Sequence, residues 1–289
     1  MHNKNIALAD FILQLKDNLF FNYKTLIVLF VFTFLNWFFE ILKWKNLITA
    51  IDKISFSESL KQSFGSLTAS LFTPNRVGEY GVKLLYFKKE LRKKVLLLNL
   101  VSNVSQMIVT LLFGVVGLIY MFNNNTIDFP LLKLKKVIYY FVVLLISIFG
   151  GKYFISKKTN GVYLKKINIF IKSITLIRVI KTIVYSIFRY LIFSHQFYYL
   201  LLVFGVEIDY FIAMKLIFAM YLIASVIPSL PMFDWLIKGT VAVFVFSTIK
   251  IDQLTIVTIT IITWLFNFGI PSIIGSYFVL NFKHKLNKK

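Results

Sequence analysis

Long apolar segments alternate with short basic segments along most of this 289-residue chain, and this alternation restricts the fold more than any other feature. A helix needs about 20 mainly apolar residues to cross the hydrocarbon core of a bilayer. The clearest segments of that length are 24–44, 95–122, 136–154, 179–204 and 254–282. Backbone polar groups must be paired within the chain in lipid, so such segments fold as helices. The sequence therefore predicts an all-α polytopic membrane protein with about five full spans.

The net charge of +21 comes from 33 Lys and Arg against 12 Asp and Glu, an excess typical of two classes of protein. A nucleic-acid-binding protein gathers basic residues on one exposed face. A membrane protein carries them in short loops and at span ends, chiefly on the cytoplasmic side. Here the basic runs 88–94, 152–181 and 283–289 flank apolar segments. We therefore expect membrane phospholipids, with anionic headgroups, as partners, and no nucleic acid.

The same charges predict an orientation in the membrane. The basic runs favour the cytoplasmic side, and the acidic loop 207–209 favours the outside. We expect an integral membrane protein with the C-terminus in the cytoplasm. Residues 1–23 are too polar to span and are expected to form an interfacial amphipathic helix.

Two further apolar stretches are interrupted by proline-containing breaks. They cover residues 57–87 and 210–249, and each is expected to form a re-entrant hairpin, so that the two hairpins make an inverted repeat. Irregular backbone at membrane depth is tolerated only where protein or a water-filled cavity covers it. Paired breaks in the two halves of a chain point to a substrate site near the bilayer midplane. We expect residues 1–289 to form one membrane domain.

The first break is expected to open a half-helix whose N-terminus points into the membrane. Thr73 has the residue type of an N-cap, and Pro74 suits a first helical position. Free amides at such an end bind anions. The residues of this break that we expect to contact substrate are Thr73, Pro74, Asn75, Arg76, Gly78 and Glu79, together with Lys83.

Three charged residues share one face of this half-helix, since Arg76, Glu79 and Lys83 recur at i, i+3 and i+7. One interpretation is a functional polar site, because each charge costs about 2.5–3.5 kcal/mol at the bilayer core. The other is a shallow hairpin whose charges reach the interface, with Glu79 and Lys83 forming an ordinary i,i+4 pair. The second break repeats the order of proline, acid and base in Pro231, Asp234 and Lys238.

Polar residues also recur inside two of the full spans. Asn99, Asn103 and Gln106 form a stripe in one span, and Arg189 and Gln196 lie in another. Such residues either line a cavity or hydrogen-bond between helices. A deeply placed Arg is a functional candidate, and we expect Arg189 to pair with Glu79, Asp234 or a substrate anion. Near the end of the first span, Glu40 is expected to pair with Lys43.

No motif predicts a catalytic residue, a metal site or a cofactor. The chain has no cysteine and only three scattered histidines, so the spacing of metal ligands is missing. Nucleotide-binding and metalloprotease motifs are also missing.

The break from Phe72 to Glu79, followed by Lys83, resembles the signature of the lysylphosphatidylglycerol synthase transmembrane region family. The segment 36–44, the pair Arg189-Tyr190 and the break 231–239 also fall where that family carries features. The chain departs from the family at Asn75, where glycine is common, and at Lys83 and Lys238, where arginine is common. Lysine keeps the charge but lacks the planar fork that binds phosphate bidentately.

The resemblance implies a flippase-like domain of the bacterial cytoplasmic (inner) membrane that moves a lipid between leaflets. It covers the membrane region and no aminoacyl-transferase domain, so we expect no synthase activity. Our leading hypothesis is a translocase for an anionic or aminoacylated phospholipid, or for a lipid-linked intermediate. One alternative is a membrane transferase with Glu79 or Asp234 as its base. Another is an assembly partner that transports nothing.

Overall fold

The computed structural model describes residues 22–123, 170 and 174–282, and this part of the chain folds as two similar helical halves. The first half holds α2 (Tyr23–Ile48), α3 (Phe56–Ser70), η2 (Pro74–Arg76), α4 (Val77–Leu85) and α5 (Arg92–Asn123). The second half holds α8 (Leu176–Val203), α9 (Tyr210–Val226), η3 (Pro231–Phe233), α10 (Asp234–Phe246), η4 (Ser247–Ile249), α11 (Gln253–Trp264), η5 (Leu265–Gly269) and α12 (Ile270–Leu280). The described residues are helical or irregular, which confirms the all-α prediction.

Local sequence explains where several of these helices begin. The Ser55 hydroxyl accepts from the Glu58 amide (3.1 Å) and the Glu58 carboxylate accepts from the Ser55 amide (2.9 Å), which is a capping box at α3. Asp209 and Asp252 cap α9 and α11 with their carboxylates. These caps satisfy amides that have no partner inside the helix.

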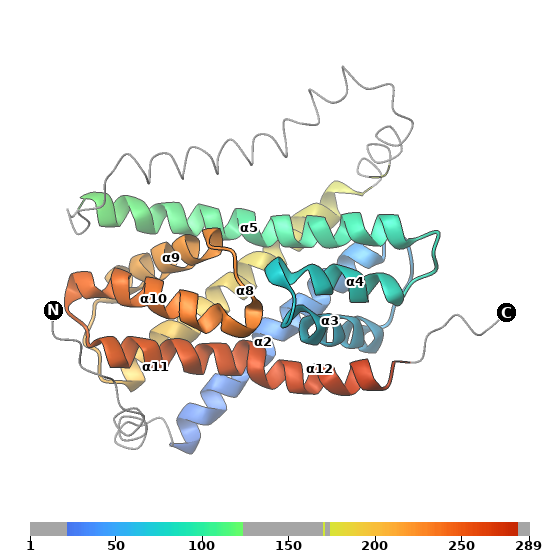
Figure 1. The fold of residues 1–289 in the computed structure, drawn as a ribbon. Coiled ribbons are helices and arrows are strands. Elements are labelled where there is room, and N and C mark those ends of the chain that lie inside the picture. The colour runs from blue at the N-terminus through green and yellow to red at the C-terminus, as the bar shows by residue number, and fades with distance from the viewer. Residues whose placement is uncertain (1–21, 124–169, 171–173, 283–289) are drawn as a thin grey trace.

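Both interrupted stretches fold as helix pairs that enter the bundle from opposite ends (Figure 1). The α3–α4 pair comes from one end and the α9–α10 pair from the other, and their tips meet midway. There the Met232 amide of the second tip donates to the Leu71 carbonyl of the first, at 3.3 Å. We call these pairs the first hairpin and the second hairpin.

A long helix of each half packs on the hairpin of the other half, as an inverted repeat requires. α5 packs on α9 of the second hairpin, and α12 packs on α3 of the first. Likewise α4 packs on α5, and α10 packs on α11. The long helices α2 and α8 run side by side in opposite directions (Figure 1). The inverted repeat predicted from the two proline breaks therefore appears in the packing of the whole bundle.

Within the described residues, four stretches are long and apolar enough to cross a membrane: Tyr23–Ile48, Arg92–Asn123, Pro231–Ile249 and Gln253–Leu280. Three of them coincide with predicted full spans, and the fourth is the longer arm of the second hairpin. α8 (28 residues) covers the predicted span 179–204 except its last residue, but it is not one of these four stretches, and its apolar sequence is interrupted by Arg189, His195 and Gln196. The predicted span 136–154 and almost all of the interfacial segment 1–23 lie outside the described residues.

Candidate functional site

Two adjoining cavities lie beside the two hairpin tips. The cavity beside the second hairpin has a volume of about 430 Å³, and the cavity beside the first has about 360 Å³. We call them the second cavity and the first cavity, after their hairpins. Six residues line both of them, namely Trp37, Arg76, Gln106, Thr110, Arg189 and Ser225. Two arginines from different halves therefore stand where the cavities adjoin.

Arg76 at the first tip has a backbone conformation that is uncommon for a residue with a side chain. Its φ and ψ are 60° and 29°, in the left-handed region. The α-helix starts only after it, at Val77, so Pro74 opens a short 3-10 turn rather than the predicted half-helix. Strained backbone of this kind is often found at functional sites. The left-handed turn places Arg76 against both cavities.

The amides of the first tip are already donors, which corrects the prediction of an anion site built on free amides. The Arg76 amide bonds the Thr73 carbonyl at 3.3 Å, and the Val77 amide bonds the Pro74 carbonyl. The Gly78 amide donates to the Thr73 hydroxyl at 2.8 Å. An anion at this tip would therefore meet the Arg76 guanidinium rather than these three amides.

The ion pair of the first hairpin is buried and fully engaged. The Lys83 ammonium lies 2.8 Å from a Glu79 carboxylate oxygen and 2.8 Å from the Asn99 side-chain oxygen. It also lies over the Trp44 ring, 4.1 Å from the centroid. Only 1% of the Lys83 side chain is exposed. The i,i+4 pair is thus present but deep, and Lys83 anchors the hairpin to α2 and α5 although it lines the first cavity.

The ion pair of the second hairpin faces the second cavity. The Lys238 ammonium lies 2.6 Å from an Asp234 carboxylate oxygen, with side chains 25% and 19% exposed. Its other close contacts are aromatic, with the Phe268 centroid at 5.2 Å and the Tyr221 centroid at 5.7 Å. The Arg76 guanidinium lies 5.0 Å from the same Phe268 ring, so that ring has a cation from each hairpin beside it.

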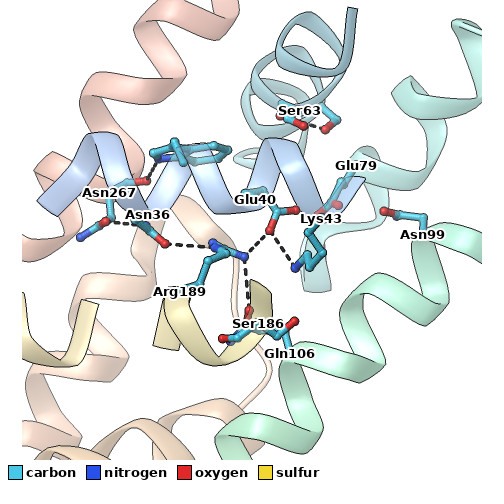
Figure 2. Close-up of polar contacts among 12 residues, drawn as sticks. Asn36, Glu40, Lys43, Ser63, Glu79, Asn99, Gln106, Ser186, Arg189 and Asn267 are labelled. Atoms are coloured by element: carbon cyan, nitrogen blue, oxygen red, sulfur yellow. Dashed lines mark hydrogen bonds and ion pairs between the residues drawn. The ribbon is translucent and has the colours of Figure 1, made fainter. Parts of the chain in front are cut away.

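Arg189 bonds to Glu40, which corrects the expectation of Glu79 or Asp234 as its partner (Figure 2). It also donates to the Asn36 side-chain oxygen at 3.0 Å and to Gln106 at 3.4 Å. The predicted pair of Glu40 and Lys43 is confirmed at 2.8 Å. The Arg189–Glu40 pair joins α8 to α2, and it is the one ion pair between the two halves in the described part of the chain.

Asn267, which the sequence reading missed, extends this network. The Asn36 amide group donates to Asn267 at 2.7 Å, and the Asn267 amide group donates to Gln196 at 2.6 Å. The Asn267 backbone carbonyl is free for the Trp37 indole (3.1 Å), because Pro271 has no N–H to bond it. Asn267 and Phe268 both lie in a π turn, η5. Pro271 near Asn267 was the available signal.

The structure brings together most, but not all, of the predicted site residues. Those that line the cavities are Arg76, Glu79, Lys83, Asn103, Gln106, Arg189, Pro231, Asp234 and Lys238. Those that do not are Thr73, Pro74, Gly78, Asn99 and Gln196. Asn99 instead holds Lys83, and Gln196 is fully buried against Asn267 and Thr33. Lining residues that were not predicted include Lys43, Ser63 and Phe268.

A comparison with known families decides the identity of this bundle. The family model described as lysylphosphatidylglycerol synthase transmembrane region matches residues 19–275. The chain belongs to this family. The match covers both hairpins and both cavities, and it confirms the resemblance carried by the first break and the segment 36–44. Comparisons with curated proteins and with solved structures gave no match. Membership of the lysylphosphatidylglycerol synthase transmembrane region family indicates a membrane function related to lipids.

Proposed function

We propose that this protein is a lipid translocase that passes a phospholipid headgroup between the leaflets through the two cavities. The supporting observation is the position of Arg76, which lines both cavities and makes no ion pair within the described residues. A charge at membrane depth costs about 2.5–3.5 kcal/mol on insertion scales. A headgroup phosphate beside Arg76 would offset that cost as it moved from one cavity to the other.

The inverted repeat supports a path between the two faces of the membrane. Each cavity belongs to a hairpin that enters from a different end of the bundle (Figure 1). In transporters built from inverted repeats, rocking of one half against the other alternately opens such cavities. The Arg189–Glu40 pair joins the halves between the cavities, so it would have to rearrange during each passage.

The charges at the two ends support an orientation. The C-terminal end of α2, the loops 49–55 and 86–91, and the N-terminal ends of α3, α5 and α8 lie at the end where the first hairpin enters (Figure 1). The charged residues of these segments include Lys45, Lys53, Lys61, Lys88, Lys89, Arg92, Lys93, Lys94, Arg178 and Lys181, against Asp52, Glu58 and Glu90. The opposite end has Lys24, Lys215 and Lys250 against Glu207, Asp209 and Asp252. The positive-inside rule then puts the first cavity toward the cytoplasm of a bacterial inner membrane, with the C-terminus on the same side.

Translocation is tested with purified full-length protein in liposomes that contain phospholipid with a fluorescent acyl chain. Reduction of the outer-leaflet fluorophore by dithionite reports the rate at which lipid crosses. We expect Arg76→Ala to reduce that rate toward that of protein-free liposomes, and Arg76→Ala with Glu79→Gln to do the same. Equal rates for the wild type and the double variant would reject the proposal.

Lys250→Ala is the matched control for Arg76→Ala. Lys250 is also a cation with left-handed backbone (φ 58°), but it is exposed and lines neither cavity. The substitution therefore removes the same charge and meets the same backbone strain at a distance from the proposed path. We expect it to keep the wild-type rate.

A further inference from the structure

The carboxylates that line the two cavities already have cationic partners. Glu40 receives Lys43 and Arg189, Glu79 receives Lys83, and Asp234 receives Lys238. The negative charge of each described carboxylate of the lining is therefore already balanced by at least one cation of the protein.

Hydrogen-bond donors, by contrast, remain available in the first cavity. The Ser63 hydroxyl is buried, with the residue 3% exposed, and has no partner among the described residues. The Tyr80 hydroxyl accepts from Asn103 at 2.9 Å and still has its own proton to donate. The Lys43 ammonium has three N–H groups but only one carboxylate partner, Glu40. Arg76 makes no ion pair in the described part of the chain. This surplus of donors fits a ligand rich in acceptors, such as a phosphate.

The charges of the lining point the same way. Five cations, namely Lys43, Arg76, Lys83, Arg189 and Lys238, stand against the three carboxylates Glu40, Glu79 and Asp234, which leaves a net charge of +2. A headgroup that carries amines besides its phosphate would bring more positive charge into a positive cavity. A net anionic headgroup would neutralise it.

From the donors and the charge we propose that these cavities select phospholipids with a net anionic headgroup and disfavour headgroups with added amines. The recognised group is the phosphodiester, received by Arg76, by the Ser63 and Tyr80 hydroxyls, and by Lys43 beside its bond to Glu40. This preference rests on the proposed translocase function. It is opposite to what the lysylated lipid in the family name would suggest for the cargo.

The experiment compares three labelled lipids in the same proteoliposomes: phosphatidylglycerol, phosphatidylethanolamine and lysyl-phosphatidylglycerol. We expect phosphatidylglycerol to cross about tenfold faster, or more, than lysyl-phosphatidylglycerol, because placing like charges together costs more than a factor of ten in affinity. Equal or faster crossing of the lysylated lipid would overturn the preference and leave translocation intact.

Charge inversion tests the role of Arg76. Arg76→Glu brings the net charge of the lining to zero, so the ratio of the two rates should approach one. Arg76→Lys keeps the charge and should keep the preference, at a lower rate because the planar fork is lost. Lys250→Glu makes the same charge change away from the cavities, and its ratio should equal that of the wild type. An unchanged ratio in Arg76→Glu would overturn the proposal.

Binding in detergent separates failure of the preference from failure of the function. Thermal unfolding of the purified protein is measured with short-chain phosphatidylglycerol, its lysylated form and inorganic phosphate. Stabilisation by phosphatidylglycerol alone, without transport, would reject the translocase and keep the headgroup preference. Equal stabilisation by inorganic phosphate would assign the donors to a soluble anion and overturn the lipid assignment.

Discussion

The two hairpins have the same order of proline, acid and base, but their ion pairs lie in different surroundings. In the first hairpin, Lys83 is held by Glu79, Asn99 and the Trp44 ring, and only 1% of its side chain is exposed. In the second, Lys238 is 25% exposed beside a cavity, with aromatic rings as its other neighbours. The i,i+4 spacing therefore accounts for the formation of each ion pair, and the surrounding helices determine how buried it is and which other groups it contacts. We infer that the first pair anchors its hairpin, whereas the second can change partners.

The two hairpins should differ most in the stability that is lost when the lysine of each ion pair is replaced. Lys83→Met leaves the Glu79 carboxylate buried without its cation, which costs about 3–5 kcal/mol of unfolding free energy. Lys238→Met is its matched control, since a partly exposed pair contributes about 1 kcal/mol or less. Unfolding titrations in mixed detergent micelles measure both.

The double variant Lys83→Met, Glu79→Leu sharpens this test, because replacing both partners of a buried pair is far less costly than removing one. It should recover much of the stability lost in Lys83→Met. Similar losses for Lys83→Met and Lys238→Met would contradict the assignment of the first pair as the anchor.

The glycines that follow the two breaks should differ by a smaller amount. A methyl group at Gly78 would collide with the Ala69 carbonyl and lie 2.8 Å from the Thr73 hydroxyl. At Gly239 the nearest atom would be a Thr260 methyl at 4.0 Å. We expect Gly78→Ala to cost about 1–3 kcal/mol by overpacking.

Gly239→Ala should be neutral or should stabilise its helix by about 0.5–1 kcal/mol. The same titrations decide between these outcomes. Equal effects of the two alanines would mean that the first tip relaxes more freely than its close contacts indicate.

The smallest difference between the hairpins is expected at the tryptophans that hold them. The Trp264 indole donates to the Pro231 carbonyl at 2.9 Å, at a partly buried position. Trp264→Phe should therefore cost about 0.5–1.5 kcal/mol. In the first half, the Trp44 indole donates to the buried Gln62 side-chain oxygen at 2.7 Å. Trp44→Phe leaves that oxygen without a partner and should cost about 1–3 kcal/mol. A larger loss from Trp264→Phe would reverse the assignment of the firmer hairpin.

Much of the fold follows from patterns that act over short distances. Apolar length predicted the spans at α2, α5 and α11–α12, and proline breaks predicted the hairpins. Helical spacing predicted the pair of Glu79 with Lys83, and the repeated order of proline, acid and base pointed to Asp234 and Lys238. These features depend on residues within a few turns of one another, so one sequence is enough to find them.

The parts that could not be predicted depend on distant residues or on backbone angles. Arg189 and Glu40 are separated by 149 positions, and no spacing rule selects that pair over Arg189 with Glu79. The left-handed turn at Arg76 moves the start of α4 past Pro74 and uses up the amides that were expected to bind an anion. Asn267 gains its role only because a π turn brings it beside Asn36.

The π turn between α11 and α12 has a consequence for how relatives of this chain vary. A π turn holds one residue more than an α turn, so every residue beyond it is rotated by about 100° from its place on an unbroken helix. Deleting one residue from Leu265–Gly269 would restore a regular helix and take Asn267 and Phe268 out of register together. A single-residue gap at this point in related chains would thus mark proteins that have lost the ring shared by the two hairpins.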